Sequence, residues 1–342
     1  MLTSALIGTG QIASSLHLPA HRGLNGSRLE WVCDMDEQAA RQFAERFGIP
    51  KWTTRLEEVL SDPGVDWVDI ATPNRTHEAL AVQAMSAGKH VLCQKPMAHS
   101  AEAAERMVRT ASETGRQLGI LMSFRSDPIL GSLRSMIEAG AFGQISHYRG
   151  KMVSSGGFRL NPGDWREQEA AGALDLLGIH LIDLFHWMEN DAIQWVQSMS
   201  RTLYAPMKGD DVTLAIYGFE SGVTALMETT YCSYAREGMP VYVLEINGTE
   251  GRAAYQIETG QLTLQLKRGY EGDCFSCRPN ETHAFKFAPY GSDAHVHRVH
   301  QQFVNSLAGE EPFPLQGEAG LRAMRLIEAT RRSSAEHKRV VL

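Results

Sequence analysis

The 342-residue sequence is poor in cysteine, has no long apolar run and carries no excess of basic charge. Its five cysteines are odd in number and scattered, which argues against a disulfide framework and favours reduced thiols, so we expect a cytoplasmic protein. No stretch approaches the ~20 uninterrupted apolar residues that a membrane helix requires. The start, MLTSALIGTG, breaks at glycine before a signal-peptide core can form. We therefore expect no membrane partner and no secretory signal.

The net charge and the scarcity of metal-ligand patterns argue against nucleic-acid binding and against a metal site. The formal net charge is −7, whereas binding phosphates needs a concentrated basic surface, so we predict no nucleic-acid partner. Cys274 and Cys277 form a single CxxC, and no second cysteine pair completes a tetrahedral zinc set. His295, His297 and His300 lack a carboxylate or cysteine at ligand spacing, and the sharing of a helix face by 297 and 300 is typical of a solvated surface. We predict no metal site.

The first third of the chain has the pattern of a nucleotide-binding half. An apolar run at 2–7 leads into a G-x-G-x-x-A turn that opens a helical pattern, and a second strand at 29–33 ends in Asp34. In such a turn Gly8 permits the tight bend and Gly10 the close approach of the backbone to a pyrophosphate, which the free amides of the helix face. Asp34 is placed to accept hydrogen bonds from the adenosine ribose and to repel a 2′-phosphate, which favours NAD over NADP. The predicted cofactor-binding residues of this part are Gly8, Thr9, Gly10, Gln11, Ile12 and Asp34.

Strands and helices continue to alternate, which predicts a parallel sheet with its ligand at the carboxyl ends of the strands. Helical patterns cover 36–47, 56–60 and 77–87, and strands cover 67–71 and 90–93. The strand at 67–71 ends in Thr72-Pro73-Asn74, and the strand at 90–93 ends in Gln94-Lys95-Pro96. Both segments should therefore reach the edge that carries the glycine turn. The further cofactor-binding candidates are Thr72, Pro73, Asn74, His77, Gln94 and Lys95.

In this order and spacing, IGTGQIA, VCD, IATPNRTH and HVLCQKPMA resemble the Gfo/Idh/MocA family of NAD(P)-dependent oxidoreductases, which includes glucose-fructose oxidoreductase and inositol dehydrogenase. GGFRLNPGDWR, GIHLIDLFHWM and the C-terminal GLRAMRLIEATRRSSAEHKRVVL are similar to family segments too, so the resemblance spans the chain. It implies an N-terminal α/β Rossmann domain, 1–121, and an α+β domain, 122–342, with a large, open, mostly antiparallel sheet. An uncovered sheet face further implies a homodimer or homotetramer.

Strand-like patterns in the second part fit that sheet. They are residues 145–153, 195–203, 212–219, 223–230, 241–247 and 262–266, with a hairpin turn at 220–222.

Lys95 stands directly before a proline, which forces an extended backbone and permits a cis peptide bond in a tight turn. The sequence alone is also compatible with a surface lysine that follows a strand. The resemblance implies that Lys95 is catalytic or orients the substrate. Most members that the chain resembles carry Glu-Lys-Pro, so Gln94 departs from the family pattern. The glutamine amide can form hydrogen bonds as a glutamate would, but it carries no charge.

The segment 173–188, ALDLLGIHLIDLFHWM, is a helix with four polar residues on one side, within an arc of roughly 140°. These residues are Asp175, His180, Asp183 and His186. They are compatible with the wetted face of an amphipathic helix. The resemblance instead makes His180 the acceptor of a substrate hydroxyl proton. It places the partner acid four residues earlier, where Leu176 stands. Asp175 lies about 140° from His180 on an ideal helix, so only a local bulge would make it a catalytic acid.

The remaining substrate-binding candidates are Arg125, Trp165, Arg166 and Asp183. Taken together, these patterns predict an NAD-dependent dehydrogenase that oxidises a secondary alcohol of a sugar, a cyclitol or a derivative. Two alternatives remain. One is a cofactor-binding sensor with little turnover, suggested by Gln94 and Leu176. The other is an enzyme that retains NAD and recycles it within one catalytic cycle.

Overall fold

A computed structural model describes residues 1–160, 163–168, 171–234, 241–289 and 291–342; Asn161 and Pro162 of the GGFRLNPGDWR segment lie outside this part. The chain forms two compact units. The first comprises Met1–Ser126 and Ser292–Arg325, and the second Asp127–Gly291 and Leu326–Leu342. The first segment of the first unit ends at Ser126, a few residues after the domain boundary expected at 121. Residues 292–325, expected in the second domain, belong to the first unit.

The first unit contains a six-stranded parallel sheet in the order β3-β2-β1-β4-β5-β6. The strands are β1 (Leu2–Ile7), β2 (Ser27–Cys33), β3 (Lys51–Thr53), β4 (Trp67–Ile70), β5 (His90–Cys93) and β6 (Leu118–Ile120). The direction of the strand order reverses between β1 and β4, which is where ligands bind in open α/β sheets. The predicted Rossmann fold is confirmed.

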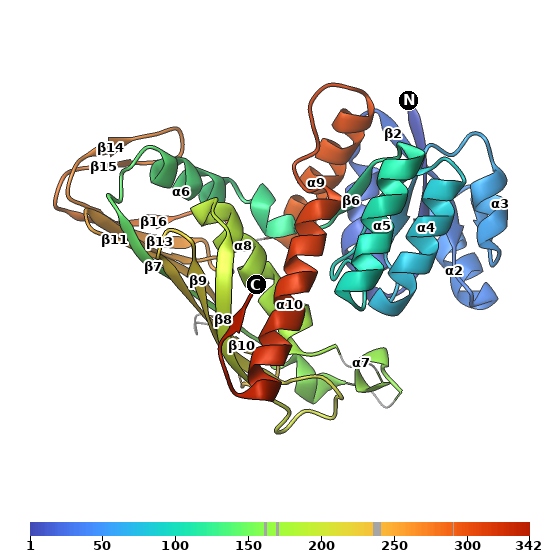
Figure 1. Cartoon of the computed structure of the whole chain (residues 1–342). Coiled ribbons are helices and arrows are strands. Elements are labelled where there is room, and N and C mark those ends of the chain that lie inside the picture. Colours follow the sequence, from blue (N-terminus) through green and yellow to red (C-terminus); the bar gives the residue numbers. More distant parts are fainter. Residues whose placement is uncertain (161–162, 169–170, 235–240, 290) are drawn as a thin grey trace. The chain divides into compact units, whose positions relative to one another are not determined.

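Helices connect and cover these strands (Figure 1). They are a π-helical turn η1 (Ala13–His17), α1 (Leu18–Arg22), α2 (Glu37–Phe47), α3 (Leu56–Ser61), the 3₁₀ turns η2 (Asn74–Thr76) and η3 (Ser123–Ser126), α4 (His77–Ser86), α5 (Ala101–Thr114), α9 (Ser292–Leu307) and the first part of α10 (Gly317–Glu336). Their ends follow local chemistry. The Asp36 side chain caps α2 by accepting from the Ala39 N–H at 3.0 Å, and Gly48, with φ of 69°, ends it.

Helix α9 packs on the first unit against η1, α1 and η3. Phe303 on α9 meets Trp67 of β4 edge-on, with ring centroids 5.5 Å apart. His300 is 0% exposed. The interpretation of a solvated face is therefore wrong for His300, because the residues that cover it come from segments far away in the sequence.

The second unit is built on a nine-stranded sheet in the order β16-β13-β12-β11-β7-β10-β9-β8-β17. Its strands are β7 (Ile145–Val153), β8 (Ile193–Arg201), β9 (Val212–Phe219), β10 (Thr224–Thr230), β11 (Tyr242–Gly248), β12 (Gly251–Gln256), β13 (Gln261–Leu266), β16 (Thr282–Lys286) and β17 (Val340–Val341). β7 and β10 pair in parallel, and the other neighbours pair antiparallel. The predicted mostly antiparallel sheet is confirmed. A separate short hairpin joins β14 (Tyr270–Glu271) and β15 (Ser276–Cys277).

One face of this sheet is covered by α8 (Ile179–Glu189), which continues a π-helical turn η5 (Leu174–Gly178). A Cβ at Gly150 of β7 would lie 2.7 Å from side-chain atoms of both Leu181 and Phe185, so glycine lets the helix approach closely. The remaining helical segments are α6 (Pro128–Glu138), the 3₁₀ turn η4 (Gly156–Arg159) and α7 (Trp165–Gln168).

The other face exposes apolar side chains on three adjacent strands. Met199 pairs with Leu214 and Ile216 pairs with Leu226, and the four side chains are 42–55% exposed. Isolated apolar residues are normal on surfaces, but cross-strand neighbours form a patch.

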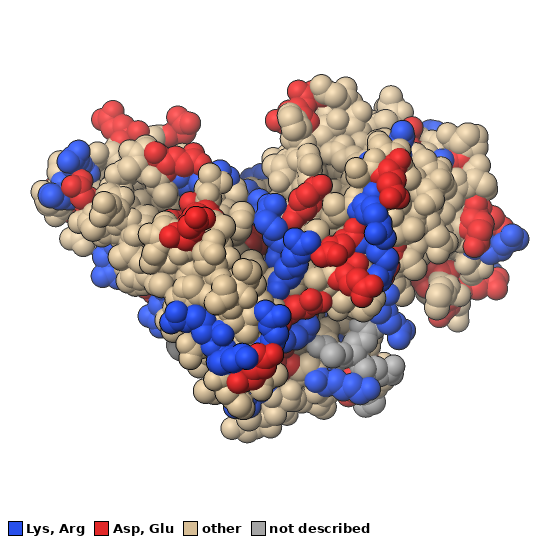
Figure 2. Space-filling view, in the orientation of Figure 1, with Lys and Arg blue, Asp and Glu red and all other residues tan. Residues whose placement is uncertain are grey.

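Figure 2 shows charged side chains of both signs interspersed along α5. Arg106 of α5, for example, pairs with Glu78 and Glu102. Among the described residues, the helices are too short or too polar to cross a membrane.

Candidate active site

The glycine turn lies at the switch point of the parallel sheet. Gly8 follows β1 with φ of 100°, and a Cβ there would lie 2.8 Å from the carbonyl oxygen of Ala71, so only glycine fits. Gly10 is exposed, and a Cβ built on it would meet no atom within 4 Å. The space beside Gly10 is therefore open to a ligand that approaches the backbone. Both observations fit a dinucleotide pyrophosphate.

Asp34 is fixed by this turn. Its Oδ2 accepts hydrogen bonds from the Thr9 N–H at 2.8 Å and the Thr9 hydroxyl at 2.7 Å, and its Oδ1 accepts from the Asp36 N–H at 3.1 Å. Thr9 thus positions the acid in addition to lining the turn. Asp34 remains partly exposed, so the carboxylate can accept from ribose hydroxyls and its charge opposes a 2′-phosphate.

His77 lies between the loops after β4 and β5. Its ring nitrogens lie 2.8 Å from the Thr72 carbonyl oxygen and 2.9 Å from the Pro96 carbonyl oxygen. Burial lowers the pKa of His77, and a neutral imidazole carries one N–H, so it donates to one of the two carbonyls. The neutral ring thus packs between the two loops and forms a hydrogen bond to one of them. Beside it, Asn74 is 6% exposed and its Oδ1 has no hydrogen-bond partner among the described residues, which leaves an acceptor for a bound group.

Lys95 stands at the same sheet edge as the glycine turn. The strand registers set Ile7 beside Ile70 and Ile70 beside Cys93, and Lys95 follows two residues after Cys93. The Lys95–Pro96 peptide is cis, Lys95 is partly exposed, and Met97 behind it is 0% exposed. The segments after β1, β4 and β5 therefore reach the same edge of the parallel sheet, as predicted.

Asp175 and His180 lie on a helix that does not begin as an α-helix. The Ile179 N–H donates to the Leu174 carbonyl oxygen, five residues back, so η5 contains one extra residue in the turn. An i to i+5 hydrogen bond widens the turn, which is a local bulge of the kind that a catalytic Asp175 would need. The separation of about 140° between Asp175 and His180 holds for an ideal α-helix and does not describe η5.

These side chains are buried. Asp175 is 3%, His180 9% and Asp183 3% exposed, which excludes the alternative of a wetted helix face for the three. Asp175 Oδ2 accepts from the Gly172 N–H at 2.8 Å and pairs with the Arg331 guanidinium. The acid is thus charge-compensated and tied to the start of η5.

A second buried acid lies beside Asp175. Asp210 Oδ2 accepts from the Leu174 N–H at 2.9 Å and the Thr213 hydroxyl at 2.8 Å. Burial, together with the charge of Asp175, raises the pKa of Asp210 to about 6. No sequence pattern predicts the roles of Asp210 and Arg331, because their link to η5 exists only in the fold.

The other substrate-binding candidates belong to different units of the chain. In the second unit, Arg166 bonds both carboxylate oxygens of Asp164 at 3.1 Å and lies 4.7 Å over the Trp165 ring, and its Nε is buried without a partner among the described residues. Arg125 lies on η3 of the first unit, partly buried.

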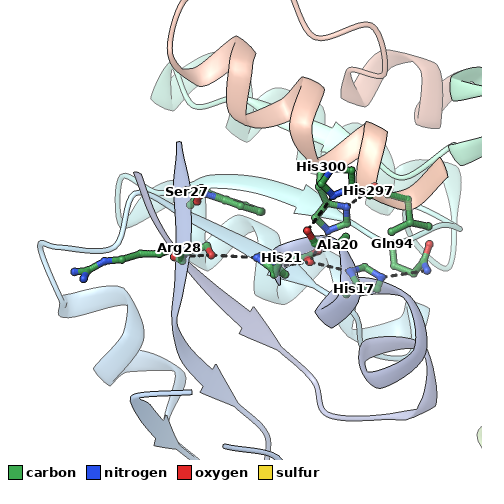
Figure 3. A network of polar contacts seen from close by, with 12 residues as sticks. His17, Ala20, His21, Ser27, Arg28, Gln94, His297 and His300 are labelled. Carbon is green, nitrogen blue, oxygen red and sulfur yellow. Dashed lines mark hydrogen bonds and ion pairs between the residues drawn. The ribbon is translucent and has the colours of Figure 1, made fainter. Parts of the chain in front are cut away.

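A buried cluster in the first unit was not predicted, although His300 was considered as a metal ligand. His17, His21 and His300 surround the carboxylate of Asp69 in the core of the first unit (Figure 3). Two signals were available. His17 and His21 have the i, i+4 spacing that places side chains on one helix face, and Asp69 interrupts a fully buried strand.

Comparison with known proteins divides the chain in a similar way. Residues 2–121 match the oxidoreductase family with an NAD-binding Rossmann fold, and residues 131–254 match the GFO/IDH/MocA C-terminal domain. The chain is 28% identical to D-apiose dehydrogenase of Paraburkholderia graminis, over 99% of this chain and 89% of that protein. It is 30% identical to 1,5-anhydro-D-fructose reductase of Ensifer adhaerens, over 77% and 80% of the two chains.

The solved structures agree at the level of the fold. A levoglucosan dehydrogenase in complex with NADH superposes with a TM-score of 0.88 at 22% identity, covering 99% of this chain and 98% of that chain. With the family matches, the glycine turn and the open space beside Gly10, these similarities lead to one conclusion. The chain belongs to the Gfo/Idh/MocA family of oxidoreductases and uses NAD.

Proposed function

We propose that this enzyme oxidises a secondary alcohol of a sugar or a cyclitol. The observation that carries the proposal is the strand register that brings the Lys95 loop to the edge of the glycine turn. The substrate class is supported by the relatives, which include D-apiose dehydrogenase and, at 29% identity over 72% of this chain and 71% of the other, scyllo-inositol 2-dehydrogenase (NAD(+)) of Bacillus subtilis. NAD(P) when bound supplies the hydride acceptor.

Each chemical role falls to one side chain. Lys95 donates a hydrogen bond to the reacting hydroxyl and orients it. His180 accepts the hydroxyl proton, a task suited to imidazole near neutral pH. Asp175, charge-paired with Arg331, holds the turn that precedes His180 and is a positioning residue in this scheme. Arg125, Trp165, Arg166 and Asp183 are proposed to bind the substrate.

The cofactor is proposed to lie along the edge described above. The residues assigned to it are Gly8, Thr9, Gly10, Gln11, Ile12, Asp34, Thr72, Pro73, Asn74, His77, Gln94 and Lys95. Asp34 favours NAD over NADP. His77 packs between the two loops that carry several of these residues.

Association and location complete the proposal. The patch of Met199, Leu214, Ile216 and Leu226 would be covered in a homodimer or homotetramer. The five cysteines are free, which fits the reducing environment of the cytoplasm.

The test is NADH formation with a panel of sugars and cyclitols. Lys95→Ala and His180→Ala should each lower kcat by about 10²- to 10⁴-fold, the usual contribution of a positioned acid or base. The NAD affinity of His180→Ala should remain within a few fold, as measured by fluorescence titration, because His180 is not among the residues assigned to the cofactor. Lys267→Ala, which removes a lysine with a 64% exposed side chain, serves as the control and should leave kcat unchanged. Full activity of Lys95→Ala would contradict the mechanism, and NAD binding without turnover on any polyol would contradict the substrate class.

A further inference from the structure

Three imidazoles converge on a single carboxylate oxygen in the core of the first unit. Oδ2 of Asp69 lies 2.8 Å from His17 Nδ1, 2.9 Å from His21 Nε2 and 2.8 Å from His300 Nε2. The side chains of Asp69, His17 and His300 are 0% exposed. Figure 3 shows the three rings pointing toward one another, and a contact leading from His17 outward to Gln94. The cluster therefore reaches the residue that precedes Lys95.

The orientation of the Gln94 amide is fixed by Lys95. The Lys95 backbone N–H donates to Gln94 Oε1 at 2.8 Å. A backbone N–H cannot accept a hydrogen bond, so the oxygen of the amide must face it. The amide nitrogen, Nε2, consequently faces His17 Nε2 at 3.3 Å.

The amide orientation in turn assigns the proton of His17. An amide nitrogen only donates, so His17 Nε2 must accept, and the ring carries its proton on Nδ1. That proton is donated to Asp69. The hydrogen bonds then run in one direction, from the Lys95 N–H through Gln94 and His17 to the buried carboxylate.

His300 supplies the positive charge that balances Asp69. Its Nδ1 lies 2.8 Å from the carbonyl oxygen of Val296, which only accepts, so Nδ1 carries a proton. Its Nε2 faces Asp69 at 2.8 Å and donates there as well, which makes the ring an imidazolium. A neutral His17 is thus compatible with a compensated carboxylate.

The same groups could be taken for a metal site. His17, Asp69 and His300 offer ligand atoms within 4.8 Å of one another. However, the carboxylate oxygen itself occupies the point on which the nitrogens converge, and the nitrogens of His17 and His300 that face it carry protons. A metal ligand must be free of its proton. The geometry is that of a hydrogen-bonded cluster.

We propose that Gln94, His17 and Asp69 are positioning residues that hold the backbone of Lys95. The inference rests on the proposed role of Lys95 in orienting the substrate. It also gives a physical reason for an amide at position 94. A carboxylate at 94 could not donate to His17 Nε2, whereas the amide matches the neutral ring.

Gln94→Glu tests this match. The introduced carboxylate still receives the Lys95 N–H but cannot donate to His17 Nε2, so the loop shifts and kcat should fall about 10- to 100-fold, since a small misplacement has an effect of that order. His17→Leu should lower kcat by a similar factor. The double variant His17→Leu/Gln94→Glu should be no slower than either single variant, because both changes break the same contact.

Losses of kcat that multiply in the double variant would overturn the proposal, because they would show that Gln94 and His17 act independently. Gln94→Met, which neither donates nor accepts, should lose kcat by a similar factor, and it serves if Gln94→Glu folds poorly.

Two measurements do not depend on activity. Nitrogen-15 NMR of wild type should show His17 in the Nδ1–H form, and the Nε2–H form would overturn the proposal. Metal analysis should find less than one equivalent of zinc; one equivalent that is lost in His300→Ala would overturn it as well. Lys95→Ala separates the two levels. An active Lys95→Ala defeats the proposed function, whereas an inactive Lys95→Ala with wild-type kcat for Gln94→Glu and Gln94→Met defeats this inference alone.

Discussion

Asp210 and Asp211 are adjacent in the chain, and the structure predicts opposite effects when each is changed to asparagine. Burial, with the charge of Asp175, raises the pKa of Asp210 from 3.8 to about 6. An acid whose folded pKa is raised binds its proton more tightly in the folded state. Its ionisation therefore removes stability as pH rises from the unfolded pKa of about 4 to the folded pKa of about 6. The full effect corresponds to about 3 kcal/mol at neutral pH.

Asp210→Asn removes this ionisation and keeps an oxygen to accept from Leu174 and Thr213. The thermal midpoint of the variant minus that of wild type should therefore rise between about pH 4 and pH 7, by about 2–4 °C per kcal/mol for a unit of this size. The measurement is a thermal melt of both proteins at several pH values in one salt concentration. A difference that stays constant or falls over that range would refute the assignment of the raised pKa.

Asp211→Asn is the matched control. Burial of Asp211 alone would raise its pKa, but the N–H groups of Leu203, Tyr204 and Ala205, at 2.6–2.9 Å, outweigh it and hold the pKa below its usual value. Its contribution is present above the unfolded pKa and is lost as pH falls through the folded pKa. Asp211→Asn should lower stability by about 1–3 kcal/mol, with no change between about pH 4 and pH 7.

Two further predictions concern the cofactor edge. Gly8→Ala should lower stability by about 1–3 kcal/mol and weaken NAD binding, because the φ of Gly8 is 100° and the added carbon would meet backbone. Gly10→Ala should fold normally and weaken NAD binding alone. Thermal melts and fluorescence titration check both variants, and a Gly8→Ala melt equal to that of wild type would contradict the prediction. Asp34→Asn should shift the ratio of kcat/KM for NAD over NADP toward NADP by on the order of tenfold, by removing a like charge. Steady-state kinetics with both cofactors should show no such shift for Asp36→Asn, which keeps its helix cap.

The parts of this protein that could be predicted from its sequence are those with a local physical cause. The bend at Gly8 requires positive φ, and Asp34 ends a strand beside it, so the nucleotide edge is visible in a few adjacent residues. The π-helical turn before His180 is different. It involves Arg331, more than a hundred residues away, and no pattern within 173–188 predicts it.

The same distinction explains the other errors. His300 looks like a surface residue in its own helix, but it is buried because α9 returns to the first unit and meets Asp69. Strands β12, β16 and β17 were not predicted because they are short or weakly patterned, and they are stabilised by pairing with β11, β13 and β8.

The return of α9 has a consequence for how the protein is made. A ribosome completes the six parallel strands well before it reaches residue 300, so the nascent half carries Asp69 in its interior without the imidazolium that balances it. A buried carboxylate that lacks its cation is strongly unfavourable. The N-terminal half should therefore stay incompletely folded until synthesis is nearly finished, and a fragment that ends at Ser126 should be a poor substitute for the intact unit.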